Sequence, residues 1–164
     1  MKTAKKILSN FEGYCCALML AVMCVVVFLQ VVFRFVLRGS LPWSEELSRY
    51  LQVYITFWGT AYGIKTGAHL GIEAFTHLLP QKGRDILAIL VDIVGMGVCA
   101  LLIYLGASIV SSQMASGQVS PSMRIPMYFI YGAIPTGMAF CVIRYIIEIV
   151  KGVKGLFVKK EEIQ

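Results

Sequence analysis

Four long apolar stretches dominate the sequence and leave little chain for anything else. They cover residues 14–33, 43–64, 86–110 and 125–150. Each is close to the roughly 20 residues that a helix needs to cross a bilayer. Only helices and closed barrels satisfy their own backbone hydrogen bonds within lipid. The sequence therefore predicts an all-α integral membrane protein, one domain over residues 1–164 with four transmembrane helices.

The remaining chain is too short and too apolar for a soluble catalytic domain. Of the 164 residues, 58% are hydrophobic, against roughly half in soluble proteins. The sequence has no P-loop, no H-E-x-x-H, no G-x-G-x-x-G and no Ser-His-Asp set that could converge. We therefore expect no enzyme activity, no catalytic residues and no cofactor.

Cysteine and histidine are the residues that could bind metal or haem. The five cysteines all lie inside predicted spans without C-x-x-C spacing, which is typical of small packing residues. His69 and His77 are eight residues apart and outside the spans, whereas two ligands on one helical face lie three or four apart. We expect no metal site.

The basic residues divide unequally between the two sides of the predicted membrane. Eleven lie before the first span, between the second and third, or at and after the end of the fourth. The other side has four: Arg34, Arg38, Arg49 and Arg124. By the positive-inside rule, both termini and the middle loop are cytoplasmic. This distribution accounts for the net charge of +6, so we expect no nucleic-acid partner.

The second span has two unlike faces, and its helix is predicted to begin near Pro42, because proline suits a first turn. At about 100° per residue, large side chains from Leu47 to Tyr62 share one side, and we expect them to face lipid. Small and polar residues share the other side and would seek protein. The candidate partner-interface residues are Trp43, Glu45, Glu46, Ser48, Arg49, Gln52, Thr56, Gly59 and Gly63.

The other spans contain isolated polar or helix-breaking residues. Gln30 in the first span and Asp92 in the third are intramembrane polar groups, for which we expect structural hydrogen bonds within the bundle. Pro135 is predicted to kink the fourth span, and Arg144 could pair with Glu148 four residues later. Gly13, Ala17, Ala21 and Cys24 give the first span a face of small residues.

Two connecting segments are also predicted. Residues 71–79 have apolar residues at helical spacing, typical of a short amphipathic helix on the cytoplasmic membrane surface. Residues 111–129 are polar and rich in serine, and we interpret them as a loop on the opposite side.

The order of these features resembles the small membrane subunit, or Q component, of tripartite ATP-independent periplasmic (TRAP) transporters. The resembling residues are Phe33-Arg34, the block from Trp43 to Tyr50, Gly59-Thr60-Ala61, Lys65, His69 to Ile72, Leu79-Pro80, Pro126, Tyr131 and Pro135-Thr136-Gly137.

The resemblance implies a scaffold subunit in the bacterial inner membrane. It also implies a heterodimer with a large, elevator-type membrane subunit, the M component. That subunit would carry the substrate and sodium sites, and a periplasmic substrate-binding protein would deliver organic acids such as sialic acids or dicarboxylates. Membrane lipid would surround the pair.

Two other classes remain open from the residues alone. A stand-alone, proton-coupled four-span exporter would need a carboxylate deep in the first span, and Glu12 lies at its edge. A membrane anchor of a redox enzyme would need histidines inside spans to hold haem, and both histidines lie outside.

Overall fold

The computed structural model describes residues 10–66 and 81–161. This part of the chain forms helices α2 (Phe11–Phe35), α3 (Pro42–Lys65), α5 (Gln81–Ser116), α6 (Met127–Tyr131) and α7 (Ala133–Glu161). Within it, extended pairing is limited to one isolated bridge between Val119 and Pro126. The predicted all-α class is confirmed. The predicted interfacial helix at 71–79, with His69 and His77, lies outside the described residues.

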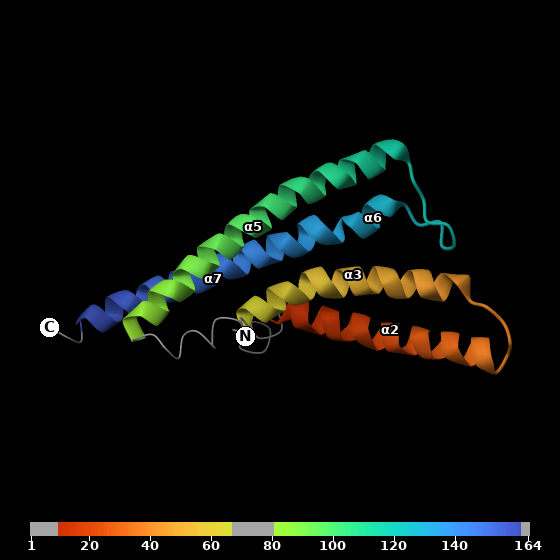
Figure 1. Cartoon of the computed structure of the whole chain (residues 1–164), viewed down its shortest axis with the longest axis horizontal. Helices are drawn as coiled ribbons and strands as arrows, with labels where there is room; N and C mark the ends of the chain where they lie inside the picture. The colour runs from red at the N-terminus through yellow and green to blue at the C-terminus, as the bar shows by residue number, and fades with distance from the viewer. Residues whose placement is uncertain (1–9, 67–80, 162–164) are drawn as a thin grey trace, which may run out of the picture.

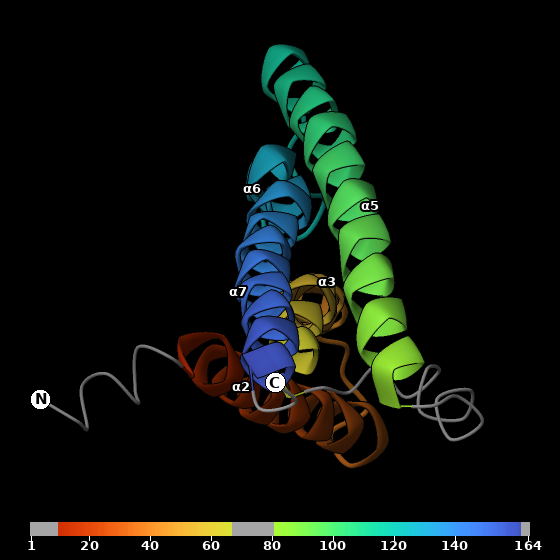
Figure 2. The same cartoon turned by 90° about the vertical axis from the view of Figure 1, so that its left-hand side faces the viewer.

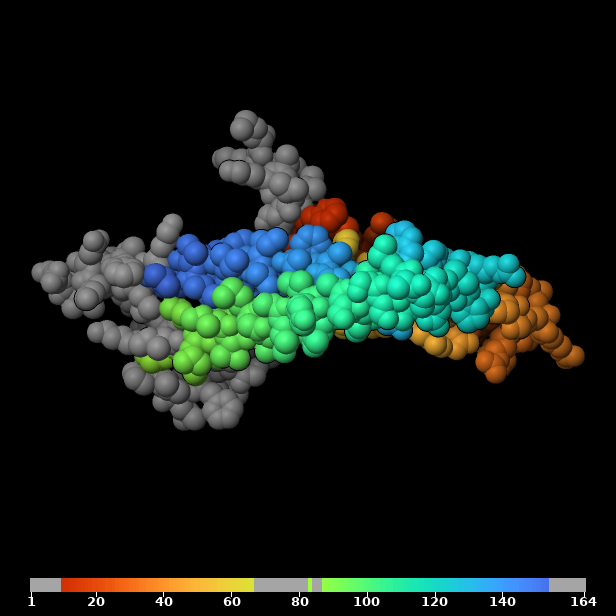
Figure 3. Space-filling model, turned by 90° about the horizontal axis from the view of Figure 1, so that it is seen from above, coloured from red at the N-terminus to blue at the C-terminus, as the bar shows by residue number. Residues whose placement is uncertain are grey.

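The long helices alternate in direction and pack as an open row (Figure 1). We call the end that holds residues 36–41 and 117–126 the loop end, and the opposite end, where α2 begins and α7 ends, the terminal end. The extensive contacts run from α5 to α7, from α7 to α3 and from α3 to α2. Figure 2 shows the same helices viewed nearly along α7. Seen from above, α5 lies side by side with α6 and α7 (Figure 3).

Three of the described helices are long and apolar enough to cross a membrane. They are Phe11–Phe35, Leu87–Ser116 and Met127–Val153. With 24 residues, α3 would span about 36 Å, so it has the length but not the composition. Its polar residues, among them Glu45, Arg49 and Gln52, lower its hydropathy. The described part of the chain thus has three candidate spans, and the fourth span stays a prediction.

The start of α3 follows from its first residues. Pro42 occupies the first turn, where its missing N–H removes no helical hydrogen bond. Glu45 also lies in this turn, where the helix dipole favours negative charge. The predicted start near Pro42 is confirmed.

The prediction of a loop from residue 111 was wrong, because α5 continues to Ser116. Hydroxyl groups hydrogen-bond back to the helix here: Ser111 Oγ donates to the Ser108 carbonyl at 2.8 Å, and Ser116 Oγ to that of Gln113 at 3.1 Å. The helix ends where Gly117 takes a φ of 62°, a conformation that glycine adopts readily.

The predicted fourth span is divided into α6 and α7, which meet at Gly132. Pro135 lies one turn later and has no N–H to donate to the carbonyl four residues before it, that of Tyr131. The break between α6 and α7 therefore lies at Gly132, three residues before Pro135. It falls in the helical turn where the Tyr131 carbonyl receives no hydrogen bond from Pro135.

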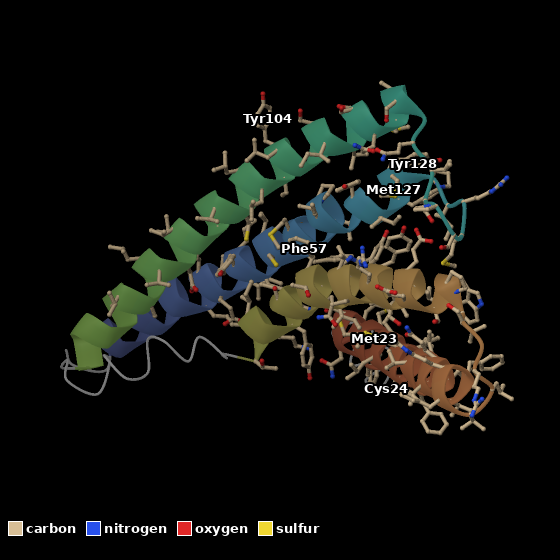
Figure 4. All side chains as sticks on the ribbon, turned by 45° about the vertical axis from the view of Figure 1, so that its right-hand side comes forward. Met23, Cys24, Phe57, Tyr104, Met127 and Tyr128 are labelled. Carbon is tan, nitrogen blue, oxygen red and sulfur yellow. The ribbon has the colours of Figure 1, made fainter. Side chains whose placement is uncertain are left out.

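The core lies where α3, α5 and α7 meet. Ala61 and Ile64 of α3, Cys99 of α5, and Met138 and Cys141 of α7 are buried there. The prediction of cysteines as packing residues is confirmed for Cys99 and Cys141, whereas Cys24 is exposed on α2 and points away from the other helices in Figure 4.

Helices α3 and α7 cross closely at Gly137. A Cβ at this position would lie 2.6 Å from the Cβ and 2.8 Å from the backbone carbon of Phe57. Figure 4 shows Phe57 between α3 and α7. Only glycine lets the two backbones approach this far, so Gly137 fixes how α3 lies against α7.

Candidate partner-binding site on α3

The large side chains of α3 pack against this chain's own helices. Tyr54 Oη donates to the Phe129 carbonyl at 2.6 Å, and Trp58 Nε1 to Thr136 Oγ1 at 3.3 Å. The ring of Tyr62 lies against Gly13 of α2. The prediction that this side faces lipid was therefore wrong: aromatic residues with a polar tip bury their rings where their hydroxyl or N–H finds an acceptor.

The opposite side of α3 is polar and uncovered by the described helices. We call Glu45, Arg49, Gln52, Thr56 and Thr60 the α3 stripe; all five are exposed. Arg49 pairs with Glu45 at 3.3 Å, with both side chains at least 70% exposed. Thr56 donates to the Gln52 carbonyl and Thr60 to that of Thr56, each at 2.8 Å. These interactions all stay within α3, so the stripe is available to another molecule.

The other predicted interface residues of α3 lie in different surroundings. Trp43 is exposed at the loop end, and a Cβ on Gly63 would meet open space. Ser48 is half-buried and donates to the Ser44 carbonyl at 2.8 Å. Gly59 faces the Sγ of Cys16 in the contact between α2 and α3. Gly63 thus extends the stripe, whereas Ser48 and Gly59 lie outside it.

Glu46 contacts this chain's own loop. Its Oε2 accepts hydrogen bonds from the backbone N–H groups of Ser122 and Met123, both at 3.0 Å. Its Oε1 accepts one from the Tyr50 hydroxyl. We call this set the Glu46 clamp. It ties the segment 117–126 to α3, so the carboxylate is occupied within the chain rather than exposed for a partner.

A groove runs beside the α3 stripe at the loop end. It lies between α3 and the α6 region and encloses about 820 Å³. Its lining residues are Pro42, Glu45, Glu46, Arg49, Tyr50, Val53, Phe57, Gln118, Val119, Pro121, Ser122, Met127, Ile130, Tyr131 and Ile134. We call it the α3–α6 groove. Met127 marks its α6 side in Figure 4.

The two predicted intramembrane polar residues lie elsewhere. Asp92 is half-buried on α5, one turn before Gly95, where a Cβ would lie 2.6 Å from the Tyr145 ring. Gln30 is half-buried on α2. Neither lines the groove.

A buried ion pair between α2 and α7 escaped sequence reasoning. Arg144 Nη2 donates to Glu12 Oε2 at 2.6 Å and Arg144 Nε to Oε1 at 3.2 Å, with both side chains nearly buried. The prediction that Arg144 pairs with Glu148 was wrong, because the Glu148 carboxylate instead accepts a hydrogen bond from Lys151 at 2.6 Å. The sequence did contain a signal for this pair. Glu12 and Arg144 lie toward the same predicted side of the membrane in two apolar helices, and charges in such helices need partners.

Metal-ligating residues do not gather in the described part of the chain. Among residues 10–66 and 81–161, no three His, Cys, Asp or Glu side chains lie where they could hold one ion. The polar stripe and the adjoining groove are therefore the strongest candidate site in this part of the chain.

Comparison with known proteins gives the family context of this surface. Residues 23–155 match the model of the family described as tripartite ATP-independent periplasmic transporters, DctQ component. A similar protein is the ectoine TRAP transporter small permease protein TeaB of Halomonas elongata. The two are 28% identical over 149 residues, which cover 91% of this chain and 77% of TeaB.

Two further relatives differ in their named solute and in length. The C4-dicarboxylate TRAP transporter small permease protein DctQ of Rhodobacter capsulatus is 32% identical over 115 residues, 67% of this chain and 49% of that protein. The isethionate TRAP transporter permease protein DctMQ of Oleidesulfovibrio alaskensis is 22% identical over 143 residues, 83% of this chain but only 22% of the relative. This chain thus spans about half of one relative and a smaller part of the other.

Proposed function

Because the chain belongs to the DctQ family, the small-subunit component of tripartite ATP-independent periplasmic transporters, we propose that it is a fixed scaffold for a large membrane subunit. The α3 stripe is the observation that carries this proposal. It presents a charged pair and three hydrogen-bonding side chains on a helix whose other side is already packed. In this assignment, the large subunit covers the stripe.

Membrane energetics support a protein partner at this face. We propose that α3 is the fourth span, with both termini cytoplasmic and the loop end in the periplasm of the inner membrane. On insertion scales, one charged residue at the bilayer centre costs about 2.5–3.5 kcal/mol. Gln52, Thr56 and Thr60 extend the polar surface inward from Glu45 and Arg49. The two threonine hydroxyls already donate within α3, but lipid offers no hydrogen bond to the Gln52 amide. A neighbouring polypeptide does.

The lengths of the relatives favour a large companion. Most of the DctMQ permease lies outside the segment that matches this chain. If the remainder of DctMQ is the larger transport unit, its two parts would pack together in the membrane as one polypeptide. We propose the same packing between this chain and a separate large subunit.

The proposal leaves transport chemistry to the other subunits. The relatives are named for ectoine, C4-dicarboxylates and isethionate, which are chemically different solutes. Since similar small subunits occur with such different solutes, we assign substrate selectivity and sodium coupling to the large subunit. Import of an organic acid, with sialic acid or a dicarboxylate as the first to test, remains part of this proposal.

The loop end offers a surface for a soluble periplasmic substrate-binding protein. Arg38 and Arg124 are exposed there and take φ values of 49° and 52°, left-handed conformations that are uncommon for residues other than glycine. Both loops thus hold an arginine outward at the same end. We propose that these guanidinium groups meet acidic side chains of the binding protein.

Co-purification tests the scaffold assignment. The double variant Glu45→Ala with Arg49→Ala is co-expressed with the proposed large subunit, and the complex is isolated in mild detergent. We expect at least a severalfold loss of complex or of solute uptake. The matched control is Glu148→Ala with Lys151→Ala, which removes another surface ion pair at the terminal end. Equal yield and uptake for both double variants would contradict the contact role of the stripe.

A further inference from the structure

We propose that the α3–α6 groove receives the apolar ridge of one transmembrane helix of the large subunit, while the α3 stripe hydrogen-bonds the polar flank of that same helix. This inference rests on the proposed scaffold function and says where the large subunit contacts this chain. The contacting helix of the large subunit should have large apolar side chains on one side and hydrogen-bonding side chains on the adjacent side.

The groove is held in shape by contacts within this chain. The Glu46 clamp fixes the loop 117–126 against α3, and the Tyr54 hydroxyl ties α3 to the Phe129 carbonyl of α6. The Tyr50 hydroxyl also reaches the Met127 sulfur at 3.9 Å. Hydrogen bonds within this chain thus hold α3 on one side of the groove, and α6 with the loop 117–126 on the other, in place without a partner. A preformed site loses less conformational entropy when it binds.

The chemistry of the groove changes from floor to rim. Val53 and Phe57 of α3 line it together with Ile130 and Ile134 from the α6–α7 side. Glu45 and Arg49 belong both to the groove and to the α3 stripe, so the apolar hollow and the polar surface share an edge. An occupant that matches both needs apolar and hydrogen-bonding groups side by side.

A protein helix meets this requirement better than a lipid does. From Glu45 to Thr60 the stripe covers 16 residues of α3, about 22 Å along the helix axis. An acyl chain could fill the hollow but offers no hydrogen bond to the Gln52 amide, nor a donor to the hydroxyl oxygens of Thr56 and Thr60, whose protons are already donated within α3. A single polypeptide segment that crosses lipid satisfies its own backbone as a helix. The stripe residues are exposed, so the described helices leave this side of α3 uncovered.

Substitution of Val53 tests the groove. In Val53→Trp, the indole fills the hollow without removing a charge, and we expect at least a tenfold loss of the large subunit from the purified complex. Val53→Ala enlarges the hollow and should retain most of the complex. Ile143→Trp places the same indole on α7 at a residue that is 53% exposed and outside the groove, and should leave the yield unchanged.

A photocrosslinking residue identifies the occupant directly and does not depend on the folding of the tryptophan variant. With the crosslinker at position 53 in the co-expressed complex, we expect an adduct with one transmembrane helix of the large subunit. Adducts with phospholipid only, with a second copy of this chain or with no molecule would overturn the proposal. The crosslinker at position 143 gives the background.

The two proposals fail in distinguishable ways. If the wild-type chain does not co-purify with the large subunit at all, the scaffold function is wrong. If it co-purifies, yet Val53→Trp retains full yield and position 53 gives no adduct with the large subunit, the scaffold function stands and the groove assignment is wrong.

Discussion

Arg144 of α7 donates two hydrogen bonds to Glu12 of α2, at 2.6 and 3.2 Å, although the two residues are 132 positions apart. This pair joins the first turn of α2 to the middle of α7, past α3, which contacts both helices. At the loop end, the α3–α6 groove remains open. The buried ion pair and the open groove thus lie in different parts of the protein.

We expect Arg144→Ala to destabilise the protein by about 3–5 kcal/mol, because it leaves the Glu12 carboxylate buried without its cation. Thermal unfolding of the purified protein in detergent measures this change. In the double variant Glu12→Leu with Arg144→Met, neither charge of the pair remains, and stability should return close to that of the wild type. A double variant as unstable as the single one would show that the pair itself contributes the stability.

Glu46→Ala should loosen the loop end without unfolding the helices. The carboxylate accepts the N–H groups of Ser122 and Met123, and these would lose their acceptor. Hydrogen–deuterium exchange of residues 118–126 should therefore quicken severalfold. Glu45→Ala, one residue earlier in the same turn, is the matched control and should leave exchange in that loop unchanged. The clamp is refuted if both variants exchange alike.

Gly137→Ala should destabilise the contact between α3 and α7 by about 1–3 kcal/mol, the usual cost of overpacking. The added methyl group would lie within 3 Å of the Phe57 backbone, which cannot move aside without shifting α3. The control is Gly97→Ala on α5, where a Cβ meets open space. There the better helix propensity of alanine should raise stability by up to about 1 kcal/mol. Unfolding in detergent compares the two, and equal stabilities would argue against the close crossing.

Helix positions could be predicted from the sequence because they depend on local chemistry. The apolar stretches marked α2, α5 and the α6–α7 region, and Pro42 marked the start of α3. The extension of α5 to Ser116 was missed because serine favours loops on average, while these hydroxyls bond to the helix backbone instead.

Which neighbour each face meets could not be predicted in the same way. Periodicity divided α3 correctly into a large face and a polar face, but it carries no information on which helices lie beside them. The aromatic face was therefore assigned to lipid, although Trp58 contacts Thr136. Likewise, Glu148 was the nearest acid to Arg144 in sequence, whereas tertiary packing supplied Glu12.

The pairing of Glu12 with Arg144 also has a consequence for biosynthesis. A ribosome makes α2 before α7, so Glu12 is synthesised before Arg144. A polypeptide interrupted before Arg144 lacks this partner for the Glu12 carboxylate, and a product that extends past Arg144 supplies it. Synthesis of α7 is thereby coupled to the electrostatic stability of α2.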